Sequence, residues 1–233
     1  MRNQDSLARR QRRSNHVSSR QGQPSYSVFL TDAGKWLFAP GSDFLFAYLD
    51  DSWSDSLKAT VTTSFEEALS MSSTIKAAVK STSGQDVVNG LYLLAQPAMT
   101  LAMNTIDGMG QTAVNQSSAS GSGTAVSITQ EFFSAILGGL GGDVSPILNY
   151  LTNEMGDVQA QTSQSTVTEN FGTVVGMVSV MPILNVPVTS FQYVYSTSQV
   201  STWFVSVNCG SVERQSYDYS YTTVEYNYVK PSK

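Results

Sequence analysis

Few side chains of this sequence are suited to catalysis. The only histidine is His16, which lies in a polar, arginine-rich segment, and the only cysteine is Cys209. With one histidine in the polar arm, the rest of the chain has no Ser–His or Cys–His couple, and a structural zinc site needs several histidines or cysteines together. A disulfide within the chain is also excluded. We therefore expect no enzymatic activity, no bound metal and no cofactor.

Two acidic clusters are the remaining candidates for acid–base chemistry: Asp50, Asp51 and Asp55, and then Glu66 and Glu67. Paired carboxylates can hydrolyse glycosides when they face each other across a cleft. The first cluster instead suits the amino terminus of a helix, through capping and the helix dipole. The second falls on the solvated side of the same helix. The sequence favours a structural role for both clusters.

The glycines of segment 138–142 suggest a phosphate-binding loop by composition alone. Such a loop follows a strand and usually needs a cationic partner. The segment before Gly138 is typical of a helix, and no lysine or arginine lies nearby. We predict that these glycines break a helix.

Basic residues are unevenly distributed along the chain. Six of the thirteen lie in the first twenty residues, and none lies between Lys80 and Arg214. Because trypsin-like proteases cut after lysine and arginine, they would trim the termini and spare most of the chain. The candidate processing sites are Arg13, Arg20 and Lys230. The acidic remainder is not expected to bind nucleic acid, since phosphate neutralisation needs cationic side chains.

The composition divides the chain into two parts. Residues 1–25 are polar and cationic and have few side chains able to stabilise a fold, which predicts a disordered arm. Residues 26–233 are predicted to form a single α+β domain. The arm lacks the apolar stretch of ~7–15 residues that a secretory signal needs. It could bind RNA, contact anionic lipid or serve as a removable propeptide.

The first elements of the domain are predicted as a short strand at 27–30 and an aromatic segment at 35–48. The aromatic segment indicates either two short extended pieces or a loop packed on the core. From about Asp55, apolar residues recur at a spacing near 3.6 until Gly84, which predicts an amphipathic helix.

The next segment, 87–106, is uncharged but contains several polar residues, so it makes a poor membrane span. We expect a buried helical hairpin or a kinked helix broken at Pro97. Segment 116–124 is rich in serine and glycine and predicts a flexible loop. A capping box at Ser127 then opens a second helical region, which restarts at Ser145-Pro146.

In the last third of the chain the spacing of the apolar residues, many of them β-branched, becomes typical of strands. Segment 171–184 is apolar at both alternating sets of positions, as in a strand that helices cover on both faces. A strand that exchanges a protein environment for lipid would look similar. Segments 191–195 and 200–207 predict two further strands. The candidate membrane-inserting residues are Phe171, Val174, Val175, Met177, Val178, Val180, Met181, Ile183 and Leu184.

Three tyrosines alternate near the end of the chain: Tyr217, Tyr219 and Tyr221. Tyrosine is apolar in its body and polar at its tip, so this set could bind a lipid headgroup or a glycan. Alternating tyrosines are equally ordinary in a packed strand. Up to Tyr221 the apolar side chains have odd residue numbers, and from Val224 they have even ones. This change of face predicts a bulge near 222–223.

Helices followed by about four long strands indicate an α+β fold with segregated elements. This order resembles that of the Cyt-type cytolysins, the small δ-endotoxin family that includes fungal relatives such as volvatoxin. The similar stretches are ITQEFFSAIL, SPILNYLTNEM, TVVGMVSVMPILNVPV, FQYVY and STWFVSVN.

The resemblance implies a three-layer α/β/α sandwich, with amphipathic helices covering a mainly antiparallel sheet of long strands. It also implies a protoxin, secreted or stored as an intracellular inclusion, that is trimmed at its termini and perforates target-cell membranes. The helices would leave the sheet, and long strands would enter lipid as oligomers.

Two other classes of protein stay open. A viral coat protein would use the arm to bind RNA, although the acidic domain and its helices argue against a jelly roll. A carbohydrate-binding module would use the tyrosines. Vesicle leakage, co-purified nucleic acid and glycan binding without leakage distinguish the three.

Overall fold

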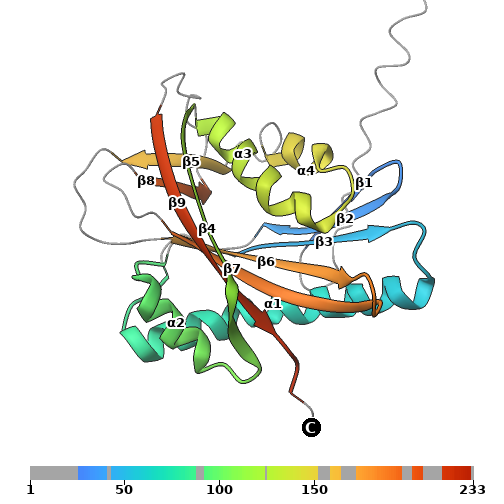
Figure 1. Cartoon of the computed structure of the whole chain (residues 1–233), viewed down its shortest axis with the longest axis horizontal. Coiled ribbons are helices and arrows are strands. Elements are labelled where there is room, and N and C mark those ends of the chain that lie inside the picture. Colours follow the sequence, from blue (N-terminus) through green and yellow to red (C-terminus); the bar gives the residue numbers. More distant parts are fainter. Residues whose placement is uncertain are drawn as a thin grey trace, which may run out of the picture.

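The computed structural model describes residues 26–40, 43–87, 92–123, 125–151, 158–163, 172–195, 201–206 and 217–231. Helices and a mainly antiparallel sheet make up this part of the chain, which confirms the predicted α+β class (Figure 1). The arm, residues 1–25, lies outside the described residues, as do His16 and Cys209.

A seven-stranded sheet with the order β1-β2-β3-β6-β7-β9-β4 forms the centre of the molecule. Its neighbouring strands are antiparallel except for β3 and β6, which are parallel. A separate sheet pairs β5 with β8. The strands are β1 (Ser27–Leu30), β2 (Gly34–Pro40), β3 (Phe44–Asp50), β4 (Met109–Gly123), β5 (Val158–Ser163), β6 (Gly172–Met181), β7 (Val186–Tyr195), β8 (Ser201–Ser206) and β9 (Tyr217–Tyr228).

The aromatic segment forms strands β2 and β3, the first of the two predicted alternatives. Alternate side chains of a strand point to opposite faces of the sheet. Trp36 and Phe38 accordingly join one buried cluster, while Leu37 and Ala39 join another. We name the two clusters after these β2 residues: the aromatic cluster contains Trp36 and Phe38, and the aliphatic cluster contains Leu37 and Ala39.

Helix α1 (Asp55–Ser83) packs on the aliphatic cluster, as its apolar spacing predicts. Ser54 caps its amino terminus by accepting a hydrogen bond from the Leu57 amide, and Gly84 ends it with a φ of 72°. Asp55 occupies the first turn, as expected for an acid near the positive end of the helix dipole.

Segment 87–106 contains neither a helical hairpin nor a kinked helix in its described residues. A single helix, α2 (Gln96–Asn104), begins with Pro97 in its first turn. Proline is tolerated there because its missing amide hydrogen would have no partner inside the helix. Before α2, Tyr92 forms an isolated bridge with Gly172. The expected break at Pro97 was thus wrong, because Pro97 starts the helix.

The predicted flexible loop at 116–124 was also wrong, because residues 116–123 belong to β4. Ser120 pairs with Ser220 in a long antiparallel ladder with β9. Ladder hydrogen bonds come from the backbone, so a strand of small side chains can pair where its neighbour supplies β-forming residues.

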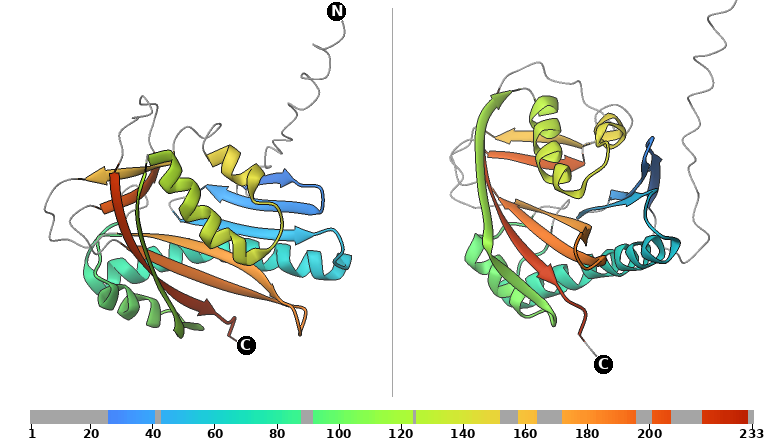
Figure 2. Two further views of the ribbon diagram at one scale, coloured as in Figure 1. Left: turned by 45° about the horizontal axis from the view of Figure 1, so that its top comes forward. Right: turned by 45° about the vertical axis from the view of Figure 1, so that its right-hand side comes forward.

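Helix α3 (Ala125–Leu137) and helix α4 (Ser145–Asn149) pack on the aromatic cluster. Figure 2 shows them on the other side of the main sheet from α1 and α2. Helix α3 begins at Ala125, two residues before the predicted capping box. The predicted break at the glycines is confirmed: a 3₁₀ turn, η1 (Gly138–Leu140), is followed by Gly141 and Gly142 at positive φ.

Strand β9 is regular across 222–223, so the predicted bulge there was wrong. Its register with β7 runs without interruption from Thr222 to Tyr228. The irregularity lies in the neighbouring strand β4, between Gln111 and Gln116. The apolar residues of β9 change from odd to even positions because the two faces of the strand are covered at different places. Tyr221 packs against the aromatic cluster on one face, whereas Val224 and Tyr226 belong to the aliphatic cluster on the other.

Candidate functional site

Strand β6 carries apolar side chains on both of its faces, because helices cover both faces of the sheet there. Val174 and Val178 belong to the aliphatic cluster under α1 and α2, and Val175 and Met177 to the aromatic cluster under α3 and α4. All four side chains are buried, and Val180 is half-buried against the aliphatic cluster. These candidate membrane-inserting residues are therefore core residues in this conformation.

The strand predicted over 171–184 ends earlier, at Met181, and Phe171 lies outside the described residues. A tight turn leads directly into β7. The amides of Leu184 and Asn185 both donate to the carbonyl of Met181, at 3.2 and 2.9 Å. Asn185 adopts a φ of 50°, a left-handed conformation that asparagine tolerates better than most residues.

This turn exposes most of its apolar side chains. Ile183 is 92% exposed and Leu184 is 63% exposed, and Met181 and Val186 on either side are each 43% exposed. No charged residue occurs from Met181 to Val186. We call these six residues, 181–186, the hairpin tip. The candidate membrane-inserting residues thus divide into a buried set in β6 and an exposed set at the tip.

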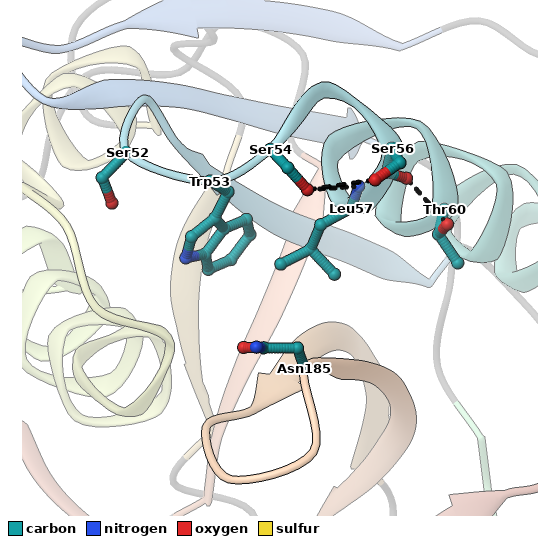
Figure 3. A pocket seen from close by; sticks show the side chains of 7 residues that line it. All are labelled: Ser52, Trp53, Ser54, Ser56, Leu57, Thr60 and Asn185. Carbon is teal, nitrogen blue, oxygen red and sulfur yellow. Dashed lines mark hydrogen bonds between the residues drawn. The ribbon is translucent and has the colours of Figure 1, made fainter.

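A cavity of about 470 Å³ separates the hairpin tip from the start of α1 (Figure 3). Trp53 and Leu57 lie on the helix side of it and Asn185 on the hairpin side. Its hydroxyl groups already have partners: Ser54 and Ser56 are 3.0 Å apart, and Thr60 donates to the Ser56 carbonyl at 2.8 Å. None of the seven lining residues is charged, so the described lining offers no acid–base group. The lining residues are Ser52, Trp53, Ser54, Ser56, Leu57, Thr60 and Asn185.

Asp43, which the sequence analysis did not single out, is buried at the start of β3. The Tyr92 hydroxyl donates to one of its carboxylate oxygens at 2.6 Å, and the Ser72 hydroxyl donates to the other. Burial raises the pKa of Asp43, while these two hydrogen bonds and the charge of Lys76 lower it in part. Burial likewise raises the pKa of Tyr92 well above its ordinary value, with the charge of Asp43 adding to the effect. Asp43 therefore ties α1 and the segment before α2 to the sheet.

No sequence signal could have found this arrangement, because Asp43, Ser72 and Tyr92 are far apart in the chain and belong to no motif. The acidic clusters that the sequence did single out are not brought together as a pair. Asp50 accepts hydrogen bonds from the amide and hydroxyl of Ser52, which lower its pKa, and Glu67 pairs with Lys230.

The other predicted site residues are dispersed. Arg13 and Arg20 lie outside the described residues. Lys230 is exposed, and its ammonium group lies 2.5 Å from the Glu67 carboxylate of α1. Hydrogen bonding to Glu67 raises the pKa of Lys230. Pro231 follows Lys230, and a proline at that position slows cleavage by trypsin-like proteases.

Of the three alternating tyrosines, only Tyr221 has a described side chain. Tyr217 and Tyr219 lie in β9, opposite Gly123 and Gly121 of β4, and their side chains lie outside the described residues. Tyr221 is half-buried, and its ring meets the Phe132 ring edge to face at 5.3 Å.

Within the described ranges, histidine, cysteine, aspartate and glutamate side chains do not gather in threes as metal ligands would. In the same part of the chain, every helix is too short or too polar to cross a membrane. No protein-family model matches the chain, and no curated protein is significantly similar to it in sequence. The resemblance to the Cyt-type cytolysins stays an interpretation of the order of elements.

Proposed function

We propose that this chain is a membrane-perforating protein that engages lipid through its β6–β7 hairpin and performs no catalytic chemistry. The observation that carries the proposal is the hairpin tip, a hydrogen-bonded turn whose Ile183 and Leu184 side chains are exposed to solvent. Contiguous exposed apolar groups mark surfaces that meet another apolar phase or partner. An uncharged tip enters lipid at a lower cost than a charged one.

After the tip has contacted lipid, the strands of the hairpin would enter the membrane, and their length suits this insertion. Strands β6 and β7 each contain ten residues. A strand tilted in a bilayer needs about 9–11 residues to cross the hydrocarbon. The backbone hydrogen bonds between β6 and β7 would persist on entry, and those at the outer edges would be satisfied by neighbouring copies. An oligomer is therefore part of the proposal.

The two faces of the hairpin differ in polarity in a way that suits insertion. The face toward α1 carries Val174 and Val178 of β6 with Phe191 of β7. The face toward α3 carries Ser179, Ser190 and Gln192 beside the apolar Val175, Met177 and Val194, so it is the more polar of the two faces. The polar side chains of a spanning strand face the aqueous interior of a pore. The face toward α1 would meet lipid, so α1 and α2 are the helices that must leave.

In this proposal the domain is a three-layer α/β/α sandwich of the Cyt-type cytolysin kind, and the helical layer of α1 and α2 detaches. Trimming of the arm at Arg13 or Arg20 would precede insertion. The protein would act outside its producing cell, after secretion or after storage as an inclusion.

Dye release from phospholipid vesicles tests the proposal, with the chain assayed before and after limited trypsin treatment. We expect release that increases after trimming, together with a protease-resistant core. No release from neutral or anionic vesicles in either form would overturn perforation. Nucleic acid that co-purifies with the untrimmed chain and is lost on trimming would instead support a coat protein with an RNA-binding arm.

A further inference from the structure

A second cavity, of about 400 Å³, lies between the carboxyl end of α3 and the main sheet. Its size falls toward the lower end of the range for small-molecule sites, about 300–1,000 Å³. Helix α3 and η1 supply one side of it, including Ile136 and Gly139, and strands β6, β7 and β9 supply the other.

The floor of this cavity is a row of polar side chains fixed by the register of the sheet. Gln192 of β7 lies directly opposite Glu225 of β9. Ser190, two residues before Gln192 and so on the same face, lies opposite Met177 of β6. An amide, a carboxylate and a hydroxyl therefore converge on one small area, with the Met177 side chain beside them.

Tyr221 provides an aromatic wall next to this floor. Its ring is held by the edge-to-face contact with Phe132 of α3. Burial raises the pKa of Tyr221, and the charge of Glu131 adds to the effect, so its hydroxyl stays protonated and can donate a hydrogen bond. The ring is thus both oriented and able to contribute a polar contact.

The charges around the cavity limit the ligand it can take. Among its described lining residues Glu225 is the one carboxylate, and none is a lysine or arginine. The carboxyl end of α3, which forms one rim, carries the negative end of the helix dipole. A phosphate or sulfate group would find no cationic partner in the described lining. A quaternary ammonium group is recognised by cages of several aromatic rings, and the described lining has only Tyr221.

We propose that this cavity binds a neutral saccharide of one or two sugar units. The Tyr221 ring would stack on an apolar face of the sugar, while Gln192, Glu225 and Ser190 would bond its hydroxyl groups. Sugar binding does not require membrane perforation, because the cavity is formed in this conformation, although Ser190 and Gln192 also belong to the hairpin that would enter lipid. A glycolipid headgroup and a soluble glycan present the same chemistry.

Saturation-transfer NMR on the full chain tests the ligand class, using glucose, galactose, N-acetylglucosamine, N-acetylgalactosamine and lactose at millimolar concentration. Choline and glucose 6-phosphate serve as charged probes. We expect transfer to at least one neutral sugar and none to glucose 6-phosphate. Transfer to no neutral sugar, or to choline alone, overturns the proposal whatever the vesicle assay shows.

Two neighbouring glycines give a matched pair of variants that locates the binding site. Gly138 and Gly139 both have open space where a side chain would start, and neither has positive φ, but only Gly139 lines the cavity. We expect Gly139→Leu to weaken sugar binding about tenfold or more and Gly138→Leu to leave it unchanged. Gln192→Ala, which removes a hydrogen-bonding group from the floor, should weaken binding by roughly tenfold. Equal binding by Gly139→Leu and Gly138→Leu, with Gln192→Ala unchanged, would place the sugar elsewhere and overturn the assignment.

Vesicles distinguish the two sources of the sugar. If a glycolipid carries it, vesicles that display the bound sugar should recruit the wild-type chain more than plain phospholipid vesicles, and Gly139→Leu should remove that difference. If a soluble glycan is the ligand, the free sugar binds and the two kinds of vesicle recruit the chain equally. Either result supports the saccharide site.

Discussion

The Tyr92 hydroxyl donates a 2.6 Å hydrogen bond to the buried carboxylate of Asp43, which also accepts from Ser72 of α1. These three residues join the sheet, the long helix and the segment before α2 at one point. Removing one partner of a buried hydrogen bond leaves the other unsatisfied, at a cost of about 1–3 kcal/mol. Because Asp43→Ala removes the acceptor of both hydroxyl groups, we expect it to lower the free energy of unfolding by at least this amount, measured by urea denaturation.

The same carboxylate should make stability depend on pH. Burial raises the pKa of Asp43 in the folded protein, so the folded state holds this proton more tightly than the unfolded state. Asp43 therefore contributes stability at low pH that is lost as pH rises through its raised pKa. Relative to Asp43→Asn, the wild-type chain should gain stability as pH falls through the raised pKa of Asp43 toward its ordinary value. A difference between the two proteins that stays constant with pH would show that Asp43 titrates normally.

The hairpin tip and helix α2 offer a matched pair for testing lipid contact. Leu184 at the tip is 63% exposed, and Leu101 on α2 is 60% exposed. Because its side chain faces solvent in a turn, Leu184→Asp should change the free energy of unfolding by less than about 0.5 kcal/mol, whereas Leu101→Asp in the last turn of α2 should cost about 1 kcal/mol. Only Leu184→Asp should reduce dye release, since it alone would carry a charge into lipid. Equal loss in both variants, or in neither, would mean that the tip does not lead insertion.

Gly142 should be the more costly of two glycines to replace. Gly142 and Gly84 both have positive φ, but a methyl group on Gly142 would overlap the Tyr48 ring, whereas Gly84 has open space. Gly84→Ala should cost about 1 kcal/mol, from backbone strain alone. Gly142→Ala should cost more, because the ring of Tyr48 must also move. Thermal melts of the two variants compare them directly, and equal melting temperatures would contradict the close approach.

Local sequence patterns predicted the elements whose stability is mostly local. The apolar spacing and Gly84 predicted α1, and the glycines of 138–142 predicted the break after α3. The patterns failed where pairing with a distant strand decides the structure. The composition of β4 is typical of a linker, and it forms a strand because it pairs with β9. The apolar residues of β9 change face along the strand because different helices cover its two ends.

The candidate sites were harder to predict than the fold for the same reason. The apolar character of 171–184 was visible in the sequence, but the division between buried Val174 and exposed Ile183 depends on where β6 turns into β7. The saccharide cavity joins Gln192 with Glu225 through sheet register, which no spacing in the sequence shows.

The ion pair between Glu67 of α1 and Lys230 gives a test of whether α1 leaves the sheet. Their charged groups are 2.5 Å apart, so a carbodiimide can join them as an amide without a spacer. Lys230 lies two residues after the end of β9, and the Val229 amide between them donates a hydrogen bond to the Gly108 carbonyl. The link would therefore fasten the middle of α1 to the end of the sheet. If α1 must detach before the β6–β7 hairpin can meet lipid, the cross-linked chain should bind vesicles but release little dye. Lys230→Gln, treated identically, cannot form the link and should keep its release. Undiminished release from protein whose Glu67–Lys230 link is verified by mass spectrometry would show that α1 stays in place during perforation.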